Sequence, residues 1–182
     1  MRNVHYACGR NILPTDAWLN IDNLTSGSFP FGIFDRHADI FNCDLLRRHP
    51  FPDNHWDVGI CEDFLEHITE PQAIRFLTEV ARTLKTSGKI TISTPSWEGI
   101  MSVSREPAKA SERYSKSKDV IQNLMHHYDD WEHVNFWSEG QLVDLMRALG
   151  FFVCETPEEH LKLMVRPDAQ AALTMTLTFQ KM

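Results

Sequence analysis

The stretch VHYACGRNILPTDAWLNID, residues 4–22, decides the fold of this chain. Its first apolar run stops at Cys8-Gly9, and a second apolar run, after a short connection, ends in one acid, Asp22. This order predicts a buried strand, a tight glycine turn and a second strand that closes on a carboxylate. A glycine turn lets bare backbone approach a ligand, and a carboxylate can accept hydrogen bonds from both hydroxyls of a ribose. The stretch therefore predicts a nucleoside-binding site in an open α/β sheet.

The composition predicts one globular domain over residues 1–182, with 42% hydrophobic and 24% charged residues. No apolar stretch is as long as a membrane span, and the N-terminus lacks a secretory signal, so we expect no membrane association.

The net charge of −7 disfavours nucleic-acid binding, which needs basic surface. The four cysteines have no zinc-site spacing and fall in or beside apolar runs. We interpret them as reduced and buried, which predicts a cytoplasmic protein.

Short apolar runs alternate with helical patterns, which predicts a mainly parallel sheet. The expected strands are Asn3–Ala7, Trp18–Asp22, Asp39–Cys43, Asp57–Cys61, Lys89–Thr94, Phe151–Cys154 and Ala172–Phe179. One expected helix begins after Thr69, has its apolar residues at Ala73, Ile74, Leu77, Val80, Ala81 and Leu84, and ends at Ser87-Gly88. A second runs from a Ser138 cap to about Leu149, with Gly150 after it.

Two segments depart from this alternation. The connection between Gly9 and Ile21 is too short for a full crossover helix, so we expect a turn there and a reduced N-terminal helical layer. The missing cover predicts apolar sheet surface that a second subunit could bury in a homo-oligomer. The segment 97–128 is a lid or insertion in which only Val120–Met125 has a helical pattern.

The ordered set of segments resembles the class I S-adenosylmethionine-dependent methyltransferases, and within them the short bacterial members. The segments are VHYACGRN, WLNID, CDL, PFPDNHWDVGICEDFLEHI, LKTSGKITISTP and HVNFWSEGQLVDLMRALGF, and they cover nearly the whole chain in collinear order. The resemblance implies an α/β fold with a Rossmann-like methyltransferase sheet of seven mostly parallel strands. It also implies S-adenosylmethionine as the cofactor and methyl transfer to oxygen or nitrogen of a small-molecule acceptor.

The resemblance places cofactor-binding residues at the ends of the first four strands. The three glycines that are usual after the first strand correspond to Ala7, Gly9 and Asn11, with Cys8 between them. Asp22 stands where an acid binds the ribose hydroxyls. Asp44 stands where an acid accepts from the adenine amino group, and the N–H of Leu45 would serve a ring nitrogen. Each of these acids could instead have a purely local role as a strand-end, cap or turn residue.

Further along, Cys61 and Glu62 correspond to positions whose carbonyls receive the cofactor ammonium group. Asp63, Glu66 and His67 resemble the E-x-x-E-H pattern of ubiquinone-type O-methyltransferases and of Mg²⁺-binding small-RNA 2′-O-methyltransferases. A carboxylate beside a histidine could orient a general base, or the set could hold a divalent ion. We favour the interpretation that Leu65-Glu66-His67 shapes the loop through hydrogen bonds to the backbone, and we expect no metal site. His133 corresponds to a position over the acceptor end of the pocket, so His67 and His133 are the candidate catalytic residues, as a base near neutral pH.

Two other classes of function stay open. A non-catalytic methyltransferase-like binding or assembly module would explain the loss of two motif glycines and of the first helix. A dinucleotide oxidoreductase or epimerase needs G-x-G-x-x-G opening a helix, which this chain lacks.

Overall fold

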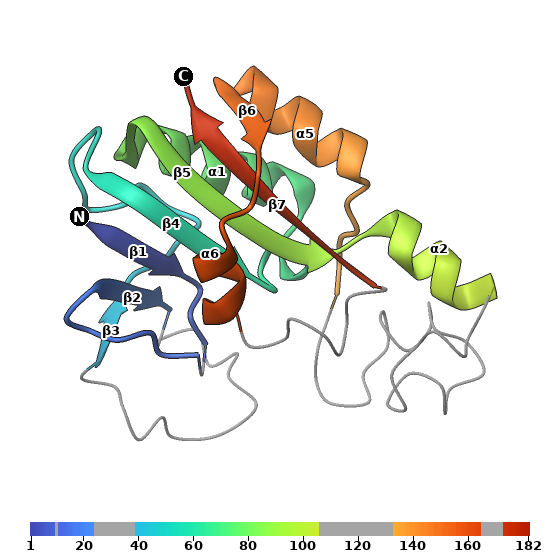
Figure 1. Ribbon diagram of the computed structural model, residues 1–182, viewed down its shortest axis with the longest axis horizontal. Coiled ribbons are helices and arrows are strands. Elements are labelled where there is room, and N and C mark those ends of the chain that lie inside the picture. Colours follow the sequence, from blue (N-terminus) through green and yellow to red (C-terminus); the bar gives the residue numbers. More distant parts are fainter. Residues whose placement is uncertain (10, 24–38, 106–132, 165–172) are drawn as a thin grey trace.

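The computed structural model describes residues 1–9, 11–23, 39–105, 133–164 and 173–182, and its centre is a seven-stranded sheet (Figure 1). The strand order is β3-β2-β1-β4-β5-β7-β6. The strands are β1 (Asn3–Tyr6), β2 (Trp18–Asp22), β3 (Ile40–Asn42), β4 (Trp56–Glu62), β5 (Leu84–Pro95), β6 (Phe151–Cys154) and β7 (Thr174–Lys181).

Five neighbouring strands, from β3 to β5, are parallel. β7 enters antiparallel between β5 and β6, with Lys89 opposite Gln180 at one end and Pro95 opposite Thr174 at the other. The expected fold class is therefore confirmed, because the sheet is mostly parallel and has the predicted number of strands. Parallel order brings the carboxyl ends of β1 to β5 to one edge, where ligands of open α/β sheets bind.

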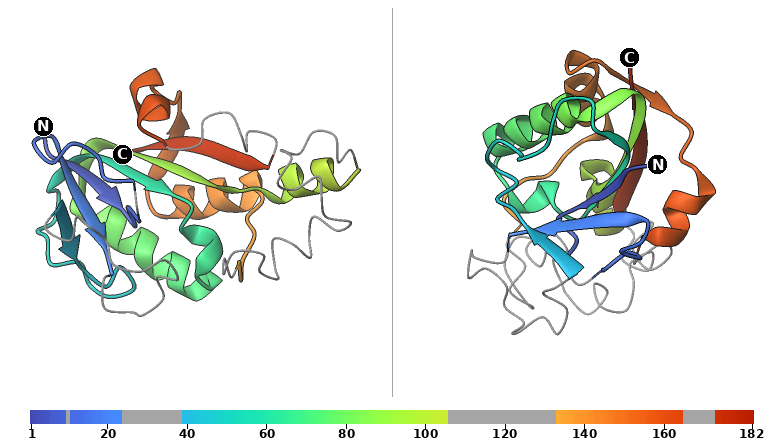
Figure 2. Two further views of the ribbon diagram at one scale, coloured as in Figure 1. Left: turned by 90° about the horizontal axis from the view of Figure 1, so that it is seen from below. Right: turned by 90° about the vertical axis from the view of Figure 1, so that its left-hand side faces the viewer.

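Helices cover the sheet unevenly (Figure 2). α1 (Glu70–Thr83) and α5 (Glu139–Ala148) lie on one face, and the short α6 (Glu158–Leu163) lies on the other. α2 (Trp97–Arg105) extends beyond the end of β5, and a 3₁₀ turn, η2 (Leu65–His67), follows β4. The main core fills the space between the sheet and α1 and α5, whereas Leu13, Ile60 and Met164 form a smaller cluster with partly buried Trp18 and Leu163.

α1 begins where the sequence predicts, because Thr69 and Gln72 form a reciprocal capping box and a proline lies in the first turn. The buried side chains of this helix are Ala73, Phe76, Leu77, Val80 and Thr83. The sequence placed Ile74 among the apolar residues of this helix, but its side chain is 40% exposed. The side of the helix that faces the core includes Phe76 instead. α5 likewise has a capping box, formed by Ser138 and Gln141, and Gly150 follows it with a φ of 88°.

The junction after α1 differs from the expected helix end. The helix stops at Thr83 and β5 starts at Leu84, five residues before the predicted strand. The register between β4 and β5 jumps from Trp56 opposite Leu84 to Val58 opposite Lys89. The bulge accommodates Ser87 at a φ of 65°, so Ser-Gly marks an irregular strand here and not a helix end.

Two helices were absent from the expectations. α2 occupies the first part of the segment 97–128, where no helix was predicted, and the rest of that segment, including Val120–Met125, lies outside the described residues. α6 follows Pro157 and carries buried His160, whose Nδ1 is 2.7 Å from Oγ1 of Thr91 on β5. A helix of six residues leaves too little apolar periodicity to be recognised.

The connection between β1 and β2 contains no helix in its described residues, 7–9 and 11–17, as predicted. The buried side chain of Asn20 holds it in place. Its amide oxygen accepts from the N–H of Leu13 at 3.0 Å and its amide nitrogen donates to the carbonyl of Leu13 at 2.9 Å. One strand side chain therefore satisfies backbone groups that a crossover helix would have satisfied internally.

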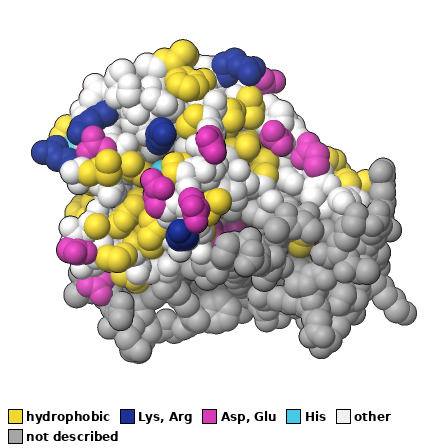
Figure 3. All heavy atoms as spheres, viewed as in Figure 1, with side chains coloured by type: hydrophobic (Ala, Val, Ile, Leu, Met, Phe, Trp, Pro, Cys, Tyr) yellow, Lys and Arg dark blue, Asp and Glu magenta, His cyan; other side chains and the backbone are white. Residues whose placement is uncertain are grey.

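On the face that carries α6, hydrophobic and charged side chains are interspersed (Figure 3). Among the described helices, none combines the length and the apolar character needed to cross a membrane.

Candidate functional site

The turn after β1 and the acid at the end of β2 form one hydrogen-bonded unit. The N–H of Gly9 donates to Oδ2 of Asp22 at 2.7 Å, and the N–H of Cys8 donates to the carbonyl of Ile21 at 3.0 Å. Gly9 has a φ of 51°, and a Cβ built on it would meet no atom of the described residues within 4 Å. The backbone of this turn is thus held against Asp22, while the described residues leave the space beside Gly9 open.

Left-handed backbone occurs at two of the three positions that match the glycine motif. Ala7 and Gly9 both have a φ of 51°, whereas Asn11 is not among the residues with positive φ. The Asn11 side chain instead donates from Nδ2 to the carbonyl of Leu163, at the end of α6. Asn11 therefore connects the turn to α6, and the left-handed backbone that favours glycine occurs at Ala7 and Gly9.

Asp22 is mostly removed from solvent, and its burial raises the pKa of its carboxyl, although the N–H groups of Gly9 and Asn23 lower it in part. Oδ1 accepts from the N–H of Asn23 at 2.6 Å. Both described hydrogen bonds to the carboxylate therefore come from neutral backbone donors, and each oxygen keeps a second lone pair for a ligand hydroxyl.

Asp44 and Leu45 follow β3 and have clear local roles. Asp44 accepts from the N–H of Leu46 at 3.0 Å and forms an exposed ion pair with Arg47 at 3.0 Å. The N–H of Cys43 donates to the carbonyl of Asp22, so this turn begins beside the end of β2. Leu45 is 3% exposed and packs in the main core. The turn role of Asp44 is thus observed, and its contact with an adenine remains a prediction.

The two cysteines of the predicted cofactor site have buried side chains, so only their backbone could contact a ligand. Cys8 is 3% exposed and Cys61 is fully buried, and burial raises the pKa of both thiols. Cys61 pairs with Tyr6 of β1 on one side and Ile92 of β5 on the other. Since β1 ends at Tyr6, Glu62 extends one residue beyond that pairing, at the carboxyl edge of the sheet.

A second group of residues lies just past the end of β4. The Glu66 carbonyl accepts from the N–H groups of Val134 and Asn135, at 2.8 and 3.1 Å. A bridge between Ser96 and Trp137 joins the same segment to the end of β5. These backbone contacts hold the segment that precedes α5 against η2, and they bring residues far apart in sequence to one place.

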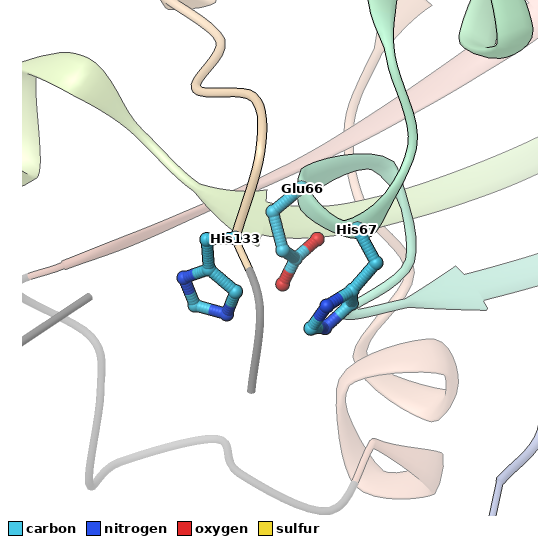
Figure 4. Close-up of side chains that lie close together, drawn as sticks. All are labelled: Glu66, His67 and His133. Carbon is cyan, nitrogen blue, oxygen red and sulfur yellow. The ribbon is translucent and has the colours of Figure 1, made fainter. Parts of the chain in front are cut away.

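The result is a cluster of Glu66, His67 and His133 (Figure 4). One ligand atom of each residue lies within 4.8 Å of those of the other two, and the ring centroids of the histidines are 4.9 Å apart. Glu66 is 1% and His133 7% exposed, whereas His67 is exposed to solvent. The structure therefore brings the two candidate catalytic histidines side by side.

Asp63, which the sequence grouped with Glu66 and His67, is not a member of this cluster. It has a φ of 49° and lies before η2, so its backbone turns away from the helical spacing that the prediction assumed. Thr94 was missed: its Oγ1 donates to Oε2 of Glu66 at 2.9 Å from the end of β5. No local pattern links Thr94 to Glu66, since only the pairing of β4 with β5 brings them together.

A family profile described as "Methyltransferase domain" matches residues 13–156. No match was found among curated proteins.

Solved structures share the fold at low sequence identity. An S-adenosylmethionine-dependent methyltransferase from Mesorhizobium loti is 13% identical, with 99% of this chain and 90% of that chain covered at a TM-score of 0.60. A possible histamine N-methyltransferase from Thermotoga maritima is 17% identical, with coverage of 100% and 82% and a TM-score of 0.59. A geranyl diphosphate C-methyltransferase from Streptomyces coelicolor A3(2), solved with Mg²⁺, geranyl diphosphate and S-adenosyl-L-homocysteine, is 13% identical, with coverage of 100% and 72% and a TM-score of 0.61.

Proposed function

The chain belongs to the methyltransferase domain family, and from that premise we propose that it transfers a methyl group from S-adenosylmethionine to an oxygen or nitrogen of a small molecule. The expected enzyme class and cofactor are those of the family and of the structural neighbours. The nature of the acceptor is the new part of the proposal. It is supported by the histidine pair at the carboxyl edge of the sheet and by neighbours whose names include small-molecule methyltransferases.

The single observation that carries the cofactor assignment is the contact between Gly9 and Asp22. It presents an open turn and a carboxylate side by side at the edge where such sheets bind ligands. In this proposal Asp22 accepts the ribose hydroxyls, the backbone of residues 7–9 adjoins the methionine part, and the turn at Asp44-Leu45 receives the adenine. Glu62 and the backbone of Cys61 bind the ammonium group.

S-adenosylmethionine supplies a methyl group made electrophilic by a cationic sulfur. The protein's part is then to align the acceptor, exclude water and remove a proton. We assign proton removal to His67 and His133, since an imidazole is a suitable base near neutral pH. His67 is the solvent-exposed member of the pair, and His133 is buried beside it.

Titration calorimetry with S-adenosylmethionine tests the cofactor site. We expect Asp22→Ala to weaken binding by about tenfold or more, since hydrogen bonds to a charged group contribute about 1.5–3 kcal/mol. We expect Gly9→Ala to weaken binding as well, because its Cβ would enter the open space beside the turn.

Gly150→Ala is the matched control, because Gly150 also has a positive φ and open space around its Cβ but follows α5. It should cost similar stability and leave cofactor affinity unchanged. Equal affinity in wild type, Asp22→Ala and Gly9→Ala would overturn the site. Binding without product formation, across a panel of phenols, catechols and amines, would favour the non-catalytic alternative.

A further inference from the structure

The turn after β1, residues 7–9 and 11, is held by contacts other than those of a following helix. The N–H of Asn11 donates to the carbonyl of Cys8 at 2.8 Å, which closes the turn. Nδ2 of Asn11 donates at 3.2 Å to the carbonyl of Leu163, which lies 152 positions further along the chain. Left-handed backbone at Ala7 costs free energy, so the turn keeps its conformation only where such contacts hold it.

The helix that Asn11 contacts, α6, has six residues and is too short to be stable by itself, because even much longer isolated helices are marginal in water. Its position therefore depends on its packing beside the β1–β2 connection (Figure 1). Leu163 and Met164, at the end of α6, pack with Leu13 and Ile60 in the smaller core cluster. Because Leu13 follows the turn directly, the turn and its connection both rest on this helix.

A buried histidine attaches α6 to the sheet. His160 is 5% exposed, and its Nδ1 lies 2.7 Å from Oγ1 of Thr91 on β5. Oγ1 of Thr91 also lies 2.8 Å from Oγ1 of Thr178 on β7, which in turn donates to Oγ1 of Thr156 at 3.0 Å. Loss of the imidazole would leave buried hydroxyls with fewer partners and would remove the polar contact of α6 with β5.

We propose that α6 positions the cofactor turn. His160 fixes the helix on β5, and the carbonyl of Leu163 then holds Asn11, and with it the turn, in the conformation that binds S-adenosylmethionine. His160 and Asn11 are positioning residues in this inference, which rests on the proposed function for the identity of the ligand. Because coupling between two sites is reciprocal, binding of the cofactor must also stabilise the docked position of α6.

Titration calorimetry with S-adenosylmethionine tests the two positioning residues. Asn11→Ala should raise the Kd about 3- to 10-fold, the equivalent of one lost hydrogen bond. His160→Ala should raise it by a similar factor, and His160→Asn should recover most of that loss, because an amide can replace Nδ1 as the partner of Thr91. The double variant Asn11→Ala/His160→Ala should bind no more weakly than the weaker single variant, since both substitutions break the same connection.

Hydrogen exchange of backbone amides tests the coupling without a methyl acceptor. In the cofactor-free chain, His160→Ala should speed exchange at the N–H groups of Cys8 and Asn11, which close the turn. S-adenosylmethionine should slow exchange in α6 of the wild type, and this protection should be lost in Asn11→Ala.

Val80→Ala is the matched control, because Val80 is fully buried on α1, which lies on the opposite face of the sheet from α6. It should lower stability at least as much as His160→Ala, and it should leave both the Kd and the exchange at Cys8 and Asn11 unchanged.

Equal Kd values for wild type, Asn11→Ala and His160→Ala would overturn the positioning role and leave the proposed function intact. Unchanged exchange at Cys8 and Asn11 in His160→Ala would overturn it as well. If the wild type bound no S-adenosylmethionine, the proposed function would fail, and exchange in the cofactor-free chain would still decide whether α6 holds the turn.

Discussion

The two ends of the parallel strands hold their acidic side chains differently. At the amino end, the guanidinium of Arg82 lies 2.7 Å from both Glu79 and Asp53, and it also donates to the carbonyls of Phe51 and His49. At the carboxyl end, Asp22 instead accepts from backbone N–H groups.

The pKa values reflect this difference. The hydrogen bond from Arg82 lowers the pKa of Glu79, and that from Lys85 lowers the pKa of Asp57, whereas burial raises the pKa of Asp22. Paired charges stabilise the fold, and a buried acid with neutral donors retains the capacity to bind a ligand. The comparison teaches that Glu79 and Asp57, at the amino end, are held by cations, whereas Asp22, at the carboxyl end, is held within the described residues by backbone N–H groups alone, as its proposed ligand-binding role requires.

The largest effect should come from Arg82→Met, which removes the cation and keeps part of the aliphatic stem. We expect the free energy of unfolding to fall by about 2–4 kcal/mol, because Glu79 and two carbonyls lose their partner. Urea denaturation measures this loss. Arg147→Met is the control, since its ion pair with Asp144 is exposed and should contribute less than about 1 kcal/mol. If Arg82→Met changed the affinity for S-adenosylmethionine, the ion pairs at the amino end would not be independent of the proposed cofactor site at the carboxyl end.

As the pH falls, Glu79 at the amino end and Asp22 at the carboxyl end should change the free energy of unfolding in opposite directions. Because the folded-state pKa of Glu79 is lowered, its contribution is present above its unfolded pKa and is lost as the pH falls through the folded value. Glu79→Gln should therefore cost about 1 kcal/mol near neutral pH and progressively less in acid.

Asp22 behaves in reverse. Its folded-state pKa is raised, so stability falls as the pH rises from the unfolded value through the folded value. Asp22→Asn should raise stability relative to wild type near neutral pH, and this gain should vanish at pH values below the unfolded pKa. Thermal unfolding of Glu79→Gln and Asp22→Asn, from neutral pH into acid, measures both effects. Destabilisation by both variants near neutral pH, or stabilisation by both, would contradict the difference between Glu79 and Asp22.

The smallest effect concerns the left-handed residues, which occur at both edges. Ala7→Gly should relieve strain of about 1–2 kcal/mol and lose part of that gain through a more flexible unfolded chain, for a net stabilisation of about 0.5 kcal/mol. Ser87→Gly, in the bulge near the amino end, should give a similar gain. Only the Ala7 variant should alter the Kd for S-adenosylmethionine, and a shift of that Kd with Ser87→Gly would be inconsistent with the proposed site.

Much of the fold could be predicted because its signals are local. The strands ending at Asp22 and Cys154, the capped starts of α1 and α5, and the missing first crossover helix follow from periodicity, cap residues and connection length. The predictions fail where local signals are weak, as in the six-residue α6, or misleading, as at Ser87-Gly88.

By itself the sequence determined which strand ends the candidate site residues follow, because residue type and periodicity are properties of neighbours along the chain. Only the tertiary structure decided which of these residues meet. It joined Gly9 to Asp22, left Asp63 outside the cluster, and brought Thr94 and His133 to Glu66. The physical reason is that strand pairing and the backbone hydrogen bonds to Glu66 set these distances, and both connect segments that are remote in sequence.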